Sequence, residues 1–211
     1  PCINFAAARN GVCVMTVFIN GRDLTVEQVI RVCRDGEEVK LTDEAIVNVK
    51  KARAYIERKL AEKAVIYGLT TGFGKFSNVM ISSEETEELQ RNLIMSHTCA
   101  MGPAYPARDV RAAMLLRCNA LARGNSGIRL ETLQTLIDML NAGVHPVIPQ
   151  KGSLGASGDL APLSHIALAL IDEGKAEYKG QILDSAVAMK RACIMPVTLA
   201  AKGGLALNNG P

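Results

Sequence analysis

The sequence contains no tryptophan, and aromatic residues make up only 4% of its 211 residues. Because β-sandwiches and β-barrels depend on aromatic and β-branched residues, this scarcity favours a mainly helical protein. An excess of one charge is also lacking, since the net charge is +3 with both signs interspersed. Nucleic-acid binding needs a strongly basic surface, and a membrane span needs an apolar run of ~20 residues. Neither is present, so we expect neither partner.

Histidine is also scarce, and the cysteines show no regular spacing. The three histidines, His97, His145 and His165, lack the spacing of metal ligands, so no metal site is expected. The six cysteines are scattered and form no C-x-x-C pair. This pattern favours free thiols in a reducing compartment, and we expect a cytoplasmic protein.

Capping signals and apolar periodicity predict the helices. Thr25 and Gln28 form a capping box for a helix that ends at Gly36, and Thr42 caps a helix that reaches about Glu62. The other expected elements are a strand over residues 16–19, helices over 82–97, 106–124, 130–141 and 160–172, a hairpin over 176–183 and a helix-like tail over 199–207. Residues 67–74 and 144–154 are predicted to be loops.

A change of pattern near Pro103–Pro106 suggests two domains. Residues 15–105 are predicted to form a small mixed N-terminal domain, and residues 106–211 the start of a long helical bundle. A cleaner globular pattern begins at Met15, so residues 1–14 are expected to be an extension without function.

The segment 151–163, KGSLGASGDLAPL, is a glycine-rich loop that leads into a helix. Such loops bind anions at the helix N-terminus, but Gly152, Gly155 and Gly158 do not have the spacing of a dinucleotide motif. The Gly-Lys pair at 74–75 lacks the other residues of a P-loop, and the two G-x-S-G stretches are one residue short of a nucleophile elbow. An anion-binding helical module stays open as an alternative.

Ala156-Ser157-Gly158 within this segment resembles the signature of the aromatic amino-acid ammonia-lyase and aminomutase family. The resemblance implies that the tripeptide cyclises and dehydrates to 4-methylideneimidazol-5-one (MIO), an electrophilic cofactor, with no metal or nucleotide. The residue types suit this reaction. Gly158 offers an unhindered backbone nitrogen to attack the Ala156 carbonyl, and Ser157 has a hydroxyl that can leave as water. The resemblance also implies an ammonia-lyase/fumarase-like helical fold.

Further motifs match in the same order from Met15 onward: GLTTGFG after Tyr67, LQRNLIMSH ending at His97, LRCNALARGNSGIR and GLALNNG. The resemblance implies a role for one residue in several of these motifs. Tyr67 is implied to be the catalytic acid or base, and Asn209 to hold the substrate carboxylate and the cofactor oxygen. Asp159 is implied to support cofactor formation, and we also expect it to cap the helix that follows.

The pair Ser96-His97 stands where family members select the substrate ring. Phenylalanine-type members resemble Phe-Leu here, tyrosine-type members His-Leu and histidine-type members Ser-His. A histidine can exchange hydrogen bonds with an imidazole substrate. The resemblance therefore implies elimination of ammonia from L-histidine to give trans-urocanate, the first step of histidine degradation. The alternatives are a phenylalanine or tyrosine ammonia-lyase or aminomutase, and a catalytically incomplete fragment.

The sequence departs from the family pattern near residue 211. The family motif reads Leu-Ile-Asn-Gly-Thr, whereas this sequence has Leu-Asn-Asn-Gly-Pro over residues 207–211. Family members are much longer, and the additional part carries another Tyr, an Arg and a Glu of the active site. Their sites are shared between subunits of a homotetramer. The resemblance therefore implies a truncated, N-terminal part of a tetrameric enzyme, with little or no activity by itself.

Overall fold

The structure is a computed structural model that describes residues 15–62, 64–66, 68–72, 85–155 and 158–209. The elements in these ranges are β1 (Thr16–Ile19), α1 (Val26–Ile30), the π-helical turn η1 (Arg31–Asp35), β2 (Glu38–Leu41), α2 (Asp43–Ala61), α3 (Thr86–His97), β3 (Met101–Ala104), α4 (Ala107–Ala122), α5 (Leu130–Ala142), β4 (Val144–Pro146), β5 (Pro149–Lys151), α6 (Leu160–Leu170), β6 (Lys175–Tyr178), β7 (Gln181–Asp184), α7 (Ser185–Arg191) and α8 (Gly203–Asn208). Helices dominate, which confirms the mainly α fold class. No helix in these ranges is long and apolar enough to span a bilayer.

The first elements form a parallel β–α–β unit. β1 and β2 pair from Thr16 opposite Glu38 onward. The predicted capping box is confirmed, since the side chains of Thr25 and Gln28 each accept a hydrogen bond from the other's backbone amide, at 3.3 and 2.8 Å. The helix ends at Gly36 in the left-handed region, as predicted. The strand β2 was not predicted.

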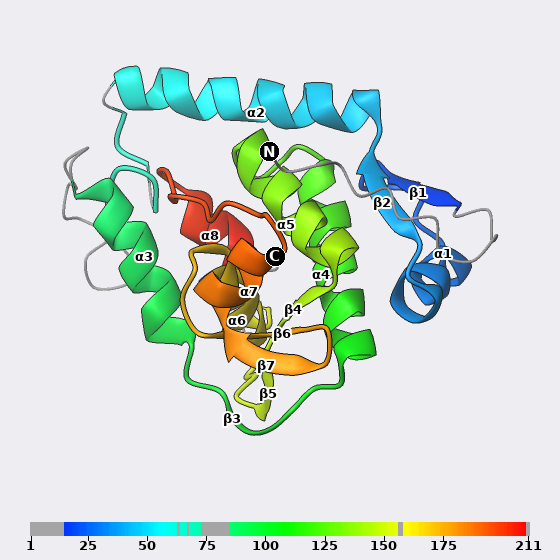
Figure 1. Cartoon of the computed structure of the whole chain (residues 1–211). Helices are drawn as coiled ribbons and strands as arrows, with labels where there is room; N and C mark the ends of the chain where they lie inside the picture. The colour runs from blue at the N-terminus through cyan, green and yellow to red at the C-terminus, as the bar shows by residue number, and fades with distance from the viewer. Residues whose placement is uncertain (1–14, 63, 67, 73–84, 156–157, 210–211) are drawn as a thin grey trace.

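The longest helix, α2, lies across one side of the molecule (Figure 1). Thr42 caps it as predicted, because its hydroxyl accepts from the Ala45 amide at 3.2 Å. Its buried apolar residues include Val49 and Ile56. The helix therefore covers the bundle with a single apolar stripe and exposes its other faces.

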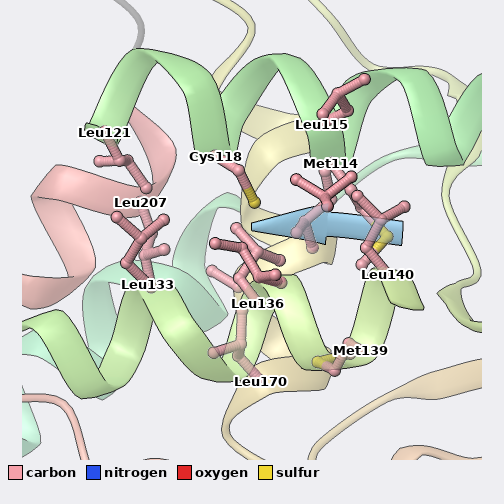
Figure 2. Close-up of a cluster of buried hydrophobic side chains, with 14 of the residues drawn as sticks. Met114, Leu115, Cys118, Leu121, Leu133, Leu136, Met139, Leu140, Leu170 and Leu207 are labelled. Atoms are coloured by element: carbon pink, nitrogen blue, oxygen red, sulfur yellow. The ribbon is translucent and has the colours of Figure 1, made fainter. Parts of the chain in front are cut away.

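The main core lies between α4 and α5. Figure 2 shows side chains from both helices pointing toward one another, with α6 and α8 contributing one labelled residue each. The labelled residues are Met114, Leu115, Cys118, Leu121, Leu133, Leu136, Met139, Leu140, Leu170 and Leu207. The same core includes Val17 and Val39 from the first sheet. The core thus contains residues from both sides of residue 105, and the division into two domains there stays a prediction.

The prediction of a loop over residues 144–154 is wrong for residues 144–146 and 149–151, which form strands. β4 pairs with β6 in the antiparallel sense, and β5 pairs with β3 through Met101 and Lys151. Pro146 and Pro149 made these strands hard to predict, because proline cannot donate to a ladder. Both strands are three residues long and lie at sheet edges, where that loss is tolerated. The predicted hairpin is confirmed as β6 and β7.

A half-buried guanidinium ties the first unit to the bundle. Arg111 on α4 donates from Nε and Nη2 to the Val32 carbonyl in η1, at 3.1 and 2.8 Å. Its Nη1 donates to Leu140 O at 2.9 Å and lies 3.2 Å from Nε2 of His145. Since a guanidinium only donates, His145 must present an unprotonated Nε2. Burial, together with the charge of Arg111, lowers the pKa of His145 to about 4.

This histidine is expected to make stability depend on pH. An unfolded chain binds a proton at this ring near pH 6.5, whereas the folded chain stays neutral to about pH 4. The contribution of the neutral His145 ring to the free energy of unfolding is therefore complete above pH 6.5 and is lost as the pH falls toward 4. We expect a loss of about 2 kcal/mol, which allows for the ring's partial exposure. His145→Gln keeps an acceptor for Arg111 but does not titrate. Urea unfolding of both proteins from pH 7.5 to 4 measures the difference, and parallel curves would contradict this account.

Candidate active site

The elements that carry the predicted site residues pack against one another. α3 ends at His97, α6 follows the Ala-Ser-Gly segment and α8 precedes Asn209. Each of these three helices contacts the other two, and Figure 1 shows α3 and α8 beside α6. Three motifs that are distant in the sequence therefore meet in one region. Tyr67, Ala156 and Ser157 lie outside the described residues.

The two glycines that flank Ala156 and Ser157 are paired. Gly155 and Gly158 form an antiparallel bridge, and both have left-handed backbones, with φ of 74° and 80°. Only glycine adopts this conformation without strain. The chain thus brings the two ends of the segment together at positions without side chains. This fits ring closure by the Gly158 nitrogen, which needs close backbone approach.

Asp159 is in the N-cap position of α6, but the predicted capping bond is wrong. Its side chain makes no capping hydrogen bond and instead accepts from the hydroxyl of Ser153. Ser153 and Asp159 therefore bracket the Ala-Ser-Gly segment from its two sides. The first turn of α6 contains no acidic residue, so Asp159 is the acidic residue next to its positive end.

A short strand pair connects His97 to the same loop. β3 begins four residues after His97, and β5 ends at Lys151. Gly152 then passes so close to Ala100 that a Cβ on Gly152 would lie 2.7 Å from the Ala100 Cα. Any larger residue at position 152 would force the two segments apart. The prediction of a loop here missed this connection.

The ring of His97 has a defined orientation. Its Nδ1 lies 2.9 Å from the Leu93 carbonyl and 3.1 Å from the Ser96 hydroxyl. A carbonyl only accepts, so Nδ1 carries the hydrogen and Nε2 is the acceptor of the neutral ring. The Ser96 hydroxyl also donates to Leu93 O at 2.9 Å. In this structure Ser96 therefore contacts the helix and His97.

Asn209 is held by hydrogen bonds of its backbone, and no described residue donates a hydrogen bond to its side-chain oxygen. Its amide donates to Leu205 O at 3.0 Å, and its carbonyl accepts from Arg117 Nη2 at 2.6 Å. The side-chain oxygen Oδ1 is buried and has no hydrogen-bond partner within the described ranges. An unused amide oxygen is suited to a ligand group that donates a hydrogen bond.

Sequence reasoning missed three polar residues around α8: Gln90, Arg117 and Ser164. Gln90 accepts from the first turn of α8, Arg117 donates to its last carbonyls, and Ser164 accepts from Asn208 at 3.2 Å. Gln90 could have been found from spacing, because it precedes His97 by seven residues and so shares its helix face.

Two hollows in the described part of the chain lie away from these residues. A groove of 770 Å³ runs between α2 and the start of α5, and one of 190 Å³ lies between α3 and the end of α6. Neither is lined by a predicted site residue. The described residues also contain no group of three or more histidine, cysteine or acidic side chains placed to hold a metal ion.

The helical fold, the Ala-Ser-Gly segment at the start of α6 and the adjoining helices with His97 and Asn209 are typical of amino-acid lyases. Residues 24–211 match the family described as aromatic amino acid lyase, and the chain belongs to this family. This confirms the resemblance drawn from the motifs.

Individual relatives carry different activities in their names. The chain is 55% identical over 194 residues to the histidine ammonia-lyase of Alkaliphilus metalliredigens, covering 92% of this chain and 38% of that protein. It is similar to the crystal structure of histidine ammonia-lyase from Trypanosoma cruzi (TM-score 0.87, 38% identity, 93% of this chain and 38% of that one). It is equally similar to a phenylalanine aminomutase of Pantoea agglomerans (TM-score 0.87, 39% identity, 93% and 37%). The chain thus spans about 38% of the length of the first relative, and the fold alone does not identify a substrate.

Proposed function

We propose that this chain is part of a carbon–nitrogen lyase that removes ammonia from L-histidine to give trans-urocanate, the first step of histidine degradation. The observation that carries the proposal is the orientation of His97 at the end of α3. With Nδ1 bonded to Leu93 O, its Nε2 can accept a hydrogen bond from the N–H of an imidazole ring, which a phenyl ring lacks. The identity to named histidine ammonia-lyases supports the same substrate.

The cofactor in this proposal is MIO, made from Ala156, Ser157 and Gly158. A bond forms between the Gly158 nitrogen and the Ala156 carbonyl carbon, and one water leaves. A second water leaves when the Ser157 hydroxyl is eliminated. The paired glycines at positions 155 and 158 support this assignment, because they bring the ends of the segment together. MIO supplies a strong electrophile, which the ordinary side chains cannot provide.

The chain's own residues bind the substrate and move its proton. Asn209 is proposed to bind the substrate carboxylate through its side-chain NH2 group, which can donate to a carboxylate oxygen. His97, oriented with the help of Ser96, holds the ring. Tyr67 is proposed as the acid or base that moves the weakly acidic proton next to the leaving amine. Asp159, bonded to Ser153, is proposed to support ring formation.

The remaining parts of the proposal follow from family membership. The partners are a small amino-acid substrate and three further copies in a homotetramer when the protein is full length, in the cytoplasm. Residues outside these 211 complete the site, which is consistent with the 38% share of the relative's length. The chain alone is therefore proposed to be inactive or weakly active.

A chimera tests the function. In it, this chain replaces the matching 194-residue stretch of the Alkaliphilus metalliredigens enzyme. We expect urocanate from histidine, with kcat/KM at least about 100-fold above that for phenylalanine or tyrosine, and almost no turnover by the 211-residue chain. The rate of urocanate formation by the chimera and by the chain alone, together with rates on a panel of amino acids, measures these expectations. A preference for phenylalanine or tyrosine, or a β-amino acid product, would support the lyase or aminomutase alternatives instead. Normal turnover by the chain alone would contradict an incomplete site.

A further inference from the structure

The start of α8 is capped by a side chain from another helix. Gln90 on α3 is fully buried, and its Oε1 accepts from the amides of Gly204 and Leu205 at 2.9 and 3.4 Å. The residue in the N-cap position of α8, Lys202, makes no side-chain capping bond. Gln90 therefore provides, from α3, the acceptor that a helix usually takes from its own cap.

The contact fixes the separation of the two helices. A Cβ on Gly204 would lie 2.8 Å from the Gln90 carbonyl oxygen and 3.1 Å from Oε1. Such distances would force one helix to move. α8 can therefore approach α3 this closely only with glycine at position 204, and the close approach brings its amides within reach of Gln90.

α8 depends on such contacts because it has only six residues, too few for a helix that is stable alone. Its end is held by Arg117 on α4, which donates to Ala206 O and Asn209 O, and by Ser164 on α6, which accepts from Asn208. Gln90 differs from both in one respect, because its helix α3 also carries His97 at its end. Gln90 thus forms a hydrogen-bonding link between the helix of His97 and the helix that leads to Asn209.

We propose that Gln90 is a positioning residue that sets α8, and through it Asn209, at a fixed distance from His97. This inference rests on the proposed function, in which Asn209 binds the carboxylate and His97 the ring of one substrate molecule. Those two groups lie at opposite ends of the substrate, so the registration of α8 on α3 decides whether both can bind at once.

The first part of the proposal, that Gln90 holds α8, is tested by hydrogen exchange on the 211-residue chain. Gln90→Met keeps the volume but removes the acceptor, and we expect the Gly204 and Leu205 amides to exchange at least about 10-fold faster. Gln90→Glu keeps an acceptor. It replaces Nε2, which is buried without a partner in the described ranges, by a second oxygen. Amide exchange is therefore expected to return toward the parent rate. Gln134→Met on α5, whose partner Asp138 is exposed, is the matched control.

The outcomes of the exchange experiment are distinct. Faster exchange in Gln90→Met, confined to residues 203–209 and largely reversed in Gln90→Glu, supports the inference. Unchanged exchange at α8, or the same acceleration in the Gln134→Met control, overturns it. If Gln90→Met does not fold, Gly204→Ala provides the second variant. It must also accelerate exchange in α8, because its Cβ pushes α8 away from α3.

The second part of the proposal, that Gln90 positions Asn209 for substrate binding, is tested by the kinetics of the chimera. If Gln90 acts through Asn209, Gln90→Met raises KM for histidine about 10-fold with a smaller effect on kcat. The same change has little further effect when Asn209→Ala is already present. Equal effects in both backgrounds would show general destabilisation and overturn the positioning role. A chimera without activity on histidine would refute the proposed function, and the exchange experiment would still decide whether Gln90 holds α8.

Discussion

Replacing Ser157 by alanine is expected to prevent completion of the cofactor. The purified parent chain should be lighter than its sequence by two water molecules, whereas Ser157→Ala should not lose the second water. One of these waters derives from the Ser157 hydroxyl, and without it no exocyclic double bond can form. In the chimera we expect turnover of histidine to fall at least about 10³-fold, because no ordinary side chain replaces the electrophile. Intact mass and peptide mapping across residues 152–175 measure the dehydration.

The chain provides a matched control for this variant. Ser126 occupies the same local pattern, G-x-S-G, within residues 124–127, and its hydroxyl accepts from the Ile128 amide at 3.4 Å. Ser126→Ala should lose two waters like the parent. A parent chain of unmodified mass would refute cofactor formation in this chain, and loss of two waters from Ser157→Ala would place the chemistry elsewhere.

The helices could be predicted because their signals are local. The capping residues Thr25 and Thr42, and the glycines that follow η1 and α5, act within a few residues of the helix ends. The strand β2 could not be predicted from EVKL alone. Its backbone is paired on one side by β1 and on the other by Asn141, whose amide bonds both N–H and C=O of Val39 at 2.9 Å. That stabilisation comes from about one hundred residues away in the sequence, so no local pattern reports it.

The candidate site was predictable in its residue types but not in its supports. Motif order indicated His97, Asn209 and the glycine loop, and the structure brings their helices together. The contacts that orient them are non-local: Gln90 with α8, Arg117 with the carbonyl of Asn209, and Gly152 against Ala100. Asp159 shows the same limit. Its position suggested a cap, but the partner that its carboxylate takes is Ser153.

His97→Leu is expected to change the choice of substrate in the chimera. The variant removes the Nε2 acceptor while keeping an apolar side chain of similar reach. The imidazole N–H of histidine then loses its partner, whereas the phenyl ring of phenylalanine loses none. We expect the ratio of kcat/KM for histidine to that for phenylalanine to fall at least about 100-fold, because a site built around a hydrogen bond discriminates strongly. Initial rates with both amino acids measure this ratio.

Two further variants separate a hydrogen-bonding role from a steric one. His97→Gln keeps an acceptor on a side chain of comparable length and should retain part of the preference for histidine. Met95→Leu changes a partly exposed residue of the same helix, on another face, and should leave the ratio unchanged. A ratio that falls equally in the leucine and glutamine variants would mean that His97 selects by shape. The hydrogen bond from Nδ1 to Leu93 O would then orient the His97 ring for packing against the substrate ring.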